Sequence, residues 1–288
     1  MNNNIFYEQL KKYNPSNIEE IKNAMKEVLQ NIILCGLAKS DFFKYAVFYG
    51  GTSLRILRNL PRFSEDLDFT LIDSKDNFNF NDYLIYAKNE INSLMIECDI
   101  YEKEKNILSS VTSAFFRFNL KKLFEISYNE YSNKIINNEL LSIKVEIEKN
   151  YFDGGDFEYK LLTYPSFCQI RTFNIETMFA SKLIAVLNRK WKLRIKGRDF
   201  YDYLFYVSNK IKINMKFLEN GLKKFSFLNE DEILTLDLLK IKLKDRFENV
   251  DFNEARKDVL PFIKNDDRFI NAFNKEIFIS SLDLLEEA

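Results

Sequence analysis

The spacing of apolar positions predicts a helix, a strand and a second helix near the start of the chain. Residues 16–40 place apolar side chains at helical spacing after Ser16 and Glu19, which form a capping-box pattern. Residues 44–51 are a short β-rich run that stops at two glycines, and residues 52–61 return to helical spacing until a proline ends the pattern. The predicted order is therefore helix, strand, tight turn and helix.

A strict alternation of apolar and acidic positions follows in residues 65–72. Leu67 and Phe69 share one face of the predicted strand. Asp66 and Asp68 share the other face, because side chains on a strand alternate with a period of two. Both carboxylates therefore project from the same side of one strand.

Two more strands are predicted further along the chain, in residues 111–120 and 141–150. The second of them alternates Ile143, Val145 and Ile147 with charged residues, so Glu146 lies on its polar face. Glu146 can therefore join the two aspartates on one face of a sheet.

The pattern becomes helical from about residue 174. Helical spacing is predicted in three segments, at residues 175–192, 197–210 and 229–247. The fold class is therefore α+β, with an α/β lobe in residues 1–160 and a mostly helical lobe in residues 161–288.

The composition excludes several kinds of catalytic and metal site. None of the 288 residues is a histidine, which excludes Ser-His-Asp and Cys-His catalysis and histidine-ligated zinc. The net charge of −1 provides no overall positive field, so any site for a polyanion must be local. Three cysteines, widely spaced among apolar residues, predict reduced core thiols and a cytoplasmic protein.

No apolar run reaches the roughly 20 residues of a membrane helix, so we expect no membrane span and no membrane partner.

The aspartate pair points to divalent metal chemistry. Carboxylates at i and i+2 on a strand lie about 6 to 7 Å apart along the backbone, so Asp66 and Asp68 can converge on one hard cation such as Mg²⁺. Mg²⁺ held in this way takes its other ligands from water and substrate phosphates. Glu146 is the candidate for a third carboxylate, which would hold a second metal ion or activate an attacking hydroxyl.

The glycine pair points to a phosphate site. Gly50 and Gly51 allow close approach of a phosphate, and the following helix offers free N–H groups and the positive end of its dipole. Thr52 and Ser53 add hydroxyl donors. A plain turn with a helix cap would explain the glycines alone, and a charged strand face would explain the aspartates alone. The two motifs together, in this order, favour phosphoryl transfer.

The segment FYGGTSLRILRNLPRFSEDLDFTL, residues 48–71, resembles the signature of the AbiEii/AbiGii toxin family of nucleotidyltransferases. That family belongs to the DNA polymerase β-like superfamily, so the resemblance implies a polymerase β-like N-terminal lobe with a mixed sheet. It also implies that the glycine and hydroxyl turn binds the phosphates of an NTP and that Asp66 and Asp68 hold one or two Mg²⁺ ions. Arg55 and Arg62 would lie on the phosphate side or be structural.

Later family motifs also have counterparts, so the resemblance covers roughly residues 20–205. They imply catalytic or nucleotide-binding roles for Lys182, inside one predicted helix, and for Asp199, which opens the next. From the residues alone, Lys182 is explained equally well as a packed apolar stem that extends its charge to solvent. Asp199 is explained equally well as a carboxylate favoured by the helix dipole.

A basic segment with one tryptophan lies between these two positions. It is a candidate RNA site, because cations suit a phosphate backbone and an aromatic ring suits a stacked base. The alternative is a solvated helix end and loop. The candidate RNA-binding residues are Arg189, Lys190, Trp191, Lys192 and Arg194.

The resemblance implies a toxin of a bacterial toxin–antitoxin or abortive-infection system, with a cognate antitoxin as a possible partner. The expected reaction is Mg²⁺-dependent transfer of a nucleoside monophosphate from an NTP to an acceptor hydroxyl, with the 3′ end of tRNA as a plausible target. Two alternatives stay open. One is an enzyme acting on a small molecule or a protein hydroxyl, and the other is a catalytically inactive module that binds nucleotides or RNA.

Overall fold

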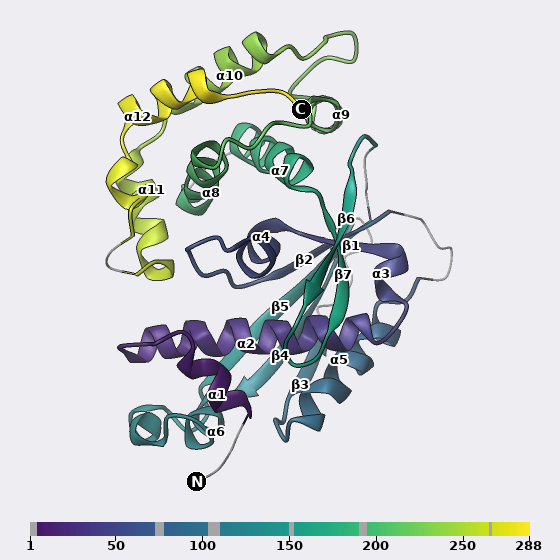
Figure 1. Ribbon diagram of the computed structural model, residues 1–288, viewed down its shortest axis with the longest axis vertical. Coiled ribbons are helices and arrows are strands. Elements are labelled where there is room, and N and C mark those ends of the chain that lie inside the picture. The colour runs from purple at the N-terminus through teal and green to yellow at the C-terminus, as the bar shows by residue number, and fades with distance from the viewer. Residues whose placement is uncertain (1–4, 73–77, 103–109, 150–152, 190–194, 265–266) are drawn as a thin grey trace. The chain divides into compact units, whose positions relative to one another are not determined.

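The computed structural model describes residues 5–72, 78–102, 110–149, 153–189, 195–264 and 267–288. The chain divides into two compact units. The first comprises Met1–Asn59, Phe63–Tyr151 and Tyr159–Thr172, and the second comprises Leu60–Arg62, Phe152–Glu158 and Phe173–Ala288. The sheet strands gather in the first part of the chain and helices dominate the last part, which confirms the α+β class (Figure 1).

The described residues form a mixed seven-stranded sheet in the order β3-β4-β5-β2-β1-β7-β6. Its strands are β1 (Ala46–Tyr49), β2 (Leu67–Leu71), β3 (Asp99–Glu102), β4 (Val111–Asn119), β5 (Leu140–Glu148), β6 (Phe157–Leu162) and β7 (Cys168–Phe173). Strand β2 lies between an antiparallel neighbour, β1, and a parallel neighbour, β5. The strand that carries the predicted metal site is therefore in the interior of the sheet.

One face of this sheet is covered by the long helix α2 (Ile18–Ala38), which packs against both α5 (Asn81–Ser93) and β5 (Figure 1). Phe48 and Phe69 from adjacent strands are buried in the same core as Ile32 of α2. The other helices of the first unit are α1 (Ile5–Lys11), α3 (Phe42–Tyr45), α4 (Gly50–Arg58), α6 (Leu120–Glu125) and the 3-10 helix η1 (Asn129–Lys134).

Several helix boundaries differ from the prediction: α4 begins at Gly50 rather than at residue 52, and α10 begins at Leu236 rather than at residue 229. Helix α2 is capped by Asn17 rather than Ser16, because the Asn17 side chain accepts the Glu20 N–H at 2.9 Å. The Glu20 carboxylate accepts the Ser16 N–H at 2.8 Å, so its return bond goes to the residue before the cap rather than to the cap itself. Helix α4 ends at Arg58, because Asn59 takes a left-handed conformation with φ 59° and donates its N–H to the Leu54 carbonyl.

The second unit is mainly helical. Its helices are α7 (Ile175–Asn188), α8 (Gly197–Ser208), α9 (Met215–Lys224), α10 (Leu236–Glu248), α11 (Phe252–Val259), α12 (Lys275–Ser280) and the 3-10 helices η2 (Leu260–Phe262), η3 (Ile270–Ala272) and η4 (Ser281–Leu284). Phe200 and Tyr203 of α8 pack against rings from the last three α-helices. The ring centroids of Phe200 and Phe278 are 5.8 Å apart, and those of Tyr203 and Phe247 are 5.2 Å apart. The C-terminal region, which carries no sequence motif, therefore supports α8.

The cysteines are free thiols, as the composition predicts. Cys35 and Cys98 are buried and Cys168 is half-buried. Among the described residues, no helix is both long enough and apolar enough to span a bilayer.

Candidate active site

The aspartates lie where the sequence pattern places them, at the start of β2. The strand begins at Leu67, so Asp66 directly precedes it and Asp68 lies inside it. Leu67 and Phe69 are fully buried in the core, whereas both aspartates are only half-buried. The predicted alternation therefore holds, with the carboxylates on the face opposite the core.

The glycine turn packs directly against one of these carboxylates. Tyr49, the last residue of β1, pairs with Asp68 across the antiparallel ladder, and Gly50 follows with φ +80°. A Cβ atom at position 50 would lie 2.6 Å from Oδ2 of Asp68. Gly50 is therefore required both by its backbone conformation and by the nearness of the Asp68 carboxylate.

The side chains after the glycines are engaged inside the first unit. The Thr52 hydroxyl donates to the Asp66 carbonyl, and the Ser53 hydroxyl lies 2.9 Å from that of Thr172. Both hydroxyls are fully buried. The Arg55 guanidinium donates to the Glu27 carboxylate at 2.8 Å. These contacts hold α4 and β2 in place. A phosphate at this turn would therefore bind to the first backbone N–H groups of α4 rather than to these side chains.

Glu146 lies on the same sheet face as Asp68, as predicted. The parallel register pairs Asp68 with Glu146, and the antiparallel register pairs Glu146 with Ser113. The Ser113 hydroxyl donates to Glu146 Oε1 at 2.8 Å, and Lys144 Nζ lies 2.6 Å from the same oxygen. Glu146 is thus one strand away from Asp68, with its charge shared by a lysine.

The donor set of Asp66 and Asp68 fits Mg²⁺, which prefers carboxylate oxygens. Within the described ranges, no group of three or more His, Cys, Asp or Glu residues is placed to hold a metal ion. A metal ion bound by these two carboxylates would therefore complete its shell with water and substrate oxygens, which is how Mg²⁺ is usually bound next to phosphates.

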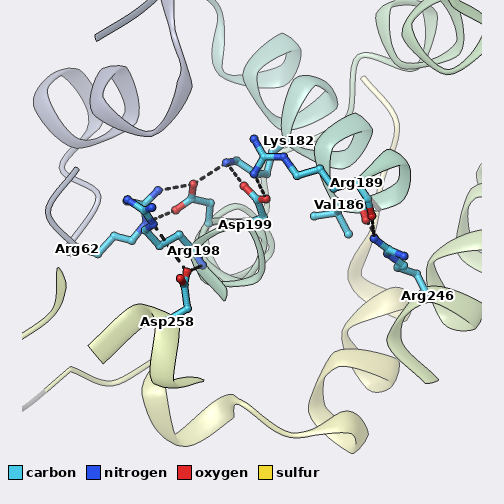
Figure 2. A network of polar contacts seen from close by, with 9 residues as sticks. Arg62, Lys182, Val186, Arg189, Arg198, Asp199, Arg246 and Asp258 are labelled. Atoms are coloured by element: carbon cyan, nitrogen blue, oxygen red, sulfur yellow. Dashed lines mark hydrogen bonds and ion pairs between the residues drawn. The ribbon is translucent and has the colours of Figure 1, made fainter. Parts of the chain in front are cut away.

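In the second unit, Lys182 lies at the centre of a buried network of charges (Figure 2). Its ammonium is 2.9 Å from Asp199 Oδ1 and 2.9 Å from Asp202 Oδ2. Asp202 also accepts two hydrogen bonds from Arg62, at 2.6 and 2.7 Å, and Asp199 accepts one from Arg189. Lys182 therefore does not extend its charge to solvent from a packed stem.

These contacts fix the charge states of the network. Burial by itself lowers the pKa of Lys182, but the Asp199 and Asp202 carboxylates outweigh it, so that pKa is raised. Burial raises the pKa of Asp199, but Lys182 and Arg189 outweigh it and hold that pKa below its usual range. The pKa of Asp202 is also lowered, because Arg62 and Lys182 outweigh its burial. Lys182 is therefore a permanent cation and both aspartates are permanent anions near neutral pH.

Further basic residues lie next to this network. Burial, with the nearby Arg189 guanidinium as the next cause, lowers the pKa of Lys196. Arg62, Lys182 and Arg189 each contact Asp199 or Asp202, and Arg198 lies 3.8 Å from the Asp258 carboxylate in the same network. The remaining predicted RNA-binding residues, Lys190, Trp191, Lys192 and Arg194, lie outside the described residues.

Two network members had weaker signals in the sequence. Asp202 follows Asp199 at i+3, a spacing that places both on one face of α8, so a helical pattern can identify it. Arg62 is separated from Asp202 by 140 residues, and no periodic pattern connects the two. Only the folded structure identifies Arg62 as the partner of Asp202.

One protein family and several solved structures are similar to this chain. The family described as "Nucleotidyl transferase AbiEii toxin, Type IV TA system" matches residues 32–275. The crystal structure of JHP933 from Helicobacter pylori is similar, with a TM-score of 0.51, 20% identity and coverage of 91% of this chain and 90% of that one. MenT4, a nucleotidyltransferase toxin from Mycobacterium tuberculosis H37Rv, matches with a TM-score of 0.49, 15% identity and 98% coverage of both chains. No curated protein matches significantly.

Proposed function

The chain belongs to the AbiEii family of nucleotidyltransferase toxins of type IV toxin–antitoxin systems, and from this premise we propose a specific reaction. The protein transfers a nucleoside monophosphate from an NTP to a hydroxyl of RNA, with the 3′ end of tRNA as the acceptor, and the transfer requires Mg²⁺. The observation that carries the proposal is the Asp66 and Asp68 pair at the start of β2, with the glycine turn after β1 packed against Asp68.

Asp66 and Asp68 would hold Mg²⁺, which supplies neutralising charge to the phosphates and to the leaving pyrophosphate. The half-buried position of both carboxylates leaves them accessible to a bound ion. Helix α4 begins at Gly50, beside Asp68, so its first N–H groups would receive the phosphates of the NTP close to the carboxylates.

Glu146 would accept the proton of the acceptor hydroxyl. It lies on the same face as Asp68 but one strand away, and Lys144 shares its charge. Because no group of three acidic residues in the described part of the chain is placed to hold one ion, a role on the attacking hydroxyl suits Glu146 better than that of a third metal ligand.

Lys182 would bind a phosphate as a fixed cation. A lysine ammonium has three N–H donors, and the contacts to Asp199 and Asp202 use two of them. Its raised pKa keeps it charged, so its contribution is electrostatic rather than that of a general base. Asp199 acts on catalysis through Lys182, which it holds in place.

The RNA acceptor is supported by the basic segment at residues 189–194, which carries four cations and one tryptophan. If this segment binds an RNA strand, the apparent affinity falls with salt, with a log–log slope of about −0.7 per phosphate contact. A small acceptor shows only a shallow dependence.

The decisive test is to incubate the protein with each labelled NTP, Mg²⁺ and total RNA, and to identify where the label goes. Label on the 3′ end of tRNA supports the proposal. Label on a small molecule or a protein hydroxyl, when these are supplied, overturns the RNA assignment but keeps the reaction. No Mg²⁺-dependent turnover of any NTP overturns the reaction and indicates an inactive binding module.

The RNA surface is tested by replacing Lys190, Lys192 and Arg194 with glutamine. Arg189 is left in place, because its contact with Asp199 would confound the result. The variant is expected to flatten the salt dependence of the RNA modification rate while NTP binding is unchanged. Equal salt slopes for the wild type and the variant would remove these residues from the RNA site.

A further inference from the structure

Three consecutive backbone carbonyls just before β2 each accept a hydrogen bond from a side chain of another element. Gln30 Nε2 donates to the Ser64 carbonyl at 3.1 Å and to the Glu65 carbonyl at 2.8 Å. The Thr52 hydroxyl donates to the next carbonyl, that of Asp66. Residues 63–66 lie outside any helix or strand, so side chains from α2 and α4 determine the path of the chain into the metal strand.

We propose that Gln30 is a positioning residue for the carboxylate pair: its amide holds the Ser64 and Glu65 carbonyls and thereby sets where Asp66 and Asp68 lie relative to each other. The proposal rests on the proposed function, because it assigns these carboxylates to a metal ion. Gln30 touches neither the reacting groups nor the ion and acts through the backbone.

The placement of Gln30 makes it suitable for this role. Its side chain is fully buried, and it projects from α2, which packs against α5 and β5. A long helix in the core is a rigid support, and small displacements of catalytic groups have large effects on rate. A donor on such a helix therefore holds the segment more firmly than a surface contact would.

The chemistry of Gln30 also favours positioning over packing. Its Oε1 atom is buried and meets no donor in the part of the chain that the structure describes. A buried acceptor without a partner has a desolvation cost, which an apolar side chain of the same size would avoid. The amide therefore serves the two carbonyls, because core packing alone would be better served by methionine.

The ion pair that Glu65 forms with α2 does not replace this function. Lys26, one turn before Gln30 on α2, forms an ion pair with the Glu65 side chain at 2.8 Å. That contact involves a half-exposed carboxylate and leaves the backbone carbonyls untouched. When Gln30 loses its donor, the Ser64 and Glu65 carbonyls lose their described partner, and the chain next to Asp66 can shift.

The test uses Gln30→Met, which keeps the length of the side chain and removes both N–H donors. Mn²⁺, as a probe for Mg²⁺, is titrated by electron paramagnetic resonance with a non-hydrolysable NTP analogue present. Mn²⁺ affinity is expected to fall about 10- to 100-fold, as for the loss of other groups that orient metal ligands. In transfer assays, high Mg²⁺ is expected to restore part of the rate of Gln30→Met but none of that of Asp68→Asn.

Two controls separate positioning from general destabilisation. Leu29→Ala opens a cavity at a fully buried neighbour on the same helix, so it lowers stability but is expected to keep Mn²⁺ affinity. Gln169→Met makes the same chemical change at an exposed position and is expected to have no effect on either property.

The proposal is overturned if Gln30→Met binds Mn²⁺ as tightly as the wild type does, or if Leu29→Ala loses as much metal affinity as Gln30→Met. It is also overturned if the wild type binds no Mn²⁺. If the wild type binds Mn²⁺ through Asp66 and Asp68 but transfers no nucleotide, the proposed function fails. In that case the Mn²⁺ comparison still decides the role of Gln30.

Discussion

The two units of the chain hold aspartates in opposite ways. In the first unit, Asp66 and Asp68 are neighbours on one strand face, half-buried, and placed by contacts to the backbone around them. In the second unit, Asp199 and Asp202 are buried and make ion pairs with Lys182. The first arrangement places two carboxylates side by side in a half-buried position, whereas the second buries two carboxylates against lysine and arginine.

The difference indicates what each pair is for. Like charges held side by side cost free energy unless a cation joins them, so the first arrangement suits a metal ion. Buried carboxylates that are paired with lysine and arginine keep those cations in place, so the second arrangement suits a fixed positive charge. Stability and activity should therefore separate when Asp66 or Asp68 is replaced, and change together when the network of Asp199 and Asp202 is broken.

The largest expected effect follows from Asp68→Asn. Loss of one metal ligand removes several kcal/mol of transition-state stabilisation, so nucleotide transfer should fall by about 10³-fold or more. Stability should not fall, because the change removes one of two neighbouring negative charges. Transfer rate and urea unfolding are measured together, with Asp231→Asn at an exposed position as the control. A fully active Asp68→Asn protein would remove the metal assignment.

Lys182→Met should reduce both the stability of the protein and the rate of nucleotide transfer. The change leaves Asp199 and Asp202 with less compensation in a buried network, and breaking buried ion pairs costs about 3 to 5 kcal/mol. Urea unfolding should show this loss, and hydrogen exchange should accelerate in α7 and α8.

The matched control for this variant is Lys223→Met, which breaks a more exposed ion pair with Glu219 in α9. That loss should not exceed about 1 kcal/mol. Equal losses in the two variants would show that the buried network is no more important to stability than a surface pair.

Gly50→Ala tests the contact between the glycine turn and Asp68 in β2. Alanine at φ +80° is strained, and its Cβ would meet Asp68 Oδ2, so we expect a stability loss of about 1 to 3 kcal/mol together with a loss of transfer. Gly154→Ala is the control, because Gly154 has φ +93° but its nearest neighbour is the flexible Lys216 side chain. For each variant, the loss of transfer is compared with the loss of stability. If the ratio were the same for Gly154→Ala and Gly50→Ala, the contact between Gly50 and Asp68 would have no special role in transfer.

The smallest expected effect is on the stability of the folded protein at low pH. The pKa values of Asp199 and Asp202 are lowered in the folded protein, so their contribution to stability is present above the unfolded pKa of about 3.9 and is lost as pH falls below it. Each carboxylate contributes a slope of at most about 1.4 kcal/mol per pH unit.

The check is the urea midpoint of the wild type and of Lys182→Met measured from neutral pH downward. Lys182→Met should show the flatter acid limb, because the carboxylates have lost the cation that lowers their pKa. Identical limbs would show that the network does not control acid stability.

Much of the first unit can be predicted from the sequence because its signals are local. Alternation identifies β2 and the face of Asp66 and Asp68, and the glycine pair identifies the turn before α4. The helix boundaries are less certain: Asn17 competes with Ser16 for one cap, and Asn59 ends α4 before the proline. Several side chains can satisfy the same orphan backbone groups, and only their packing decides which one does.

The sequence by itself therefore determined the order of the elements, the aspartate pair and the position of Lys182 within a helix, since all of these depend on periodicities of two and 3.6 residues. The partners of these groups were decided by the tertiary structure. Arg62 meets Asp202 across 140 residues of sequence, and Gln30 meets Ser64 and Glu65 across 34 and 35. A hydrogen bond between distant residues leaves no periodic trace in the chain, because it exists only when folding brings the donor to the acceptor.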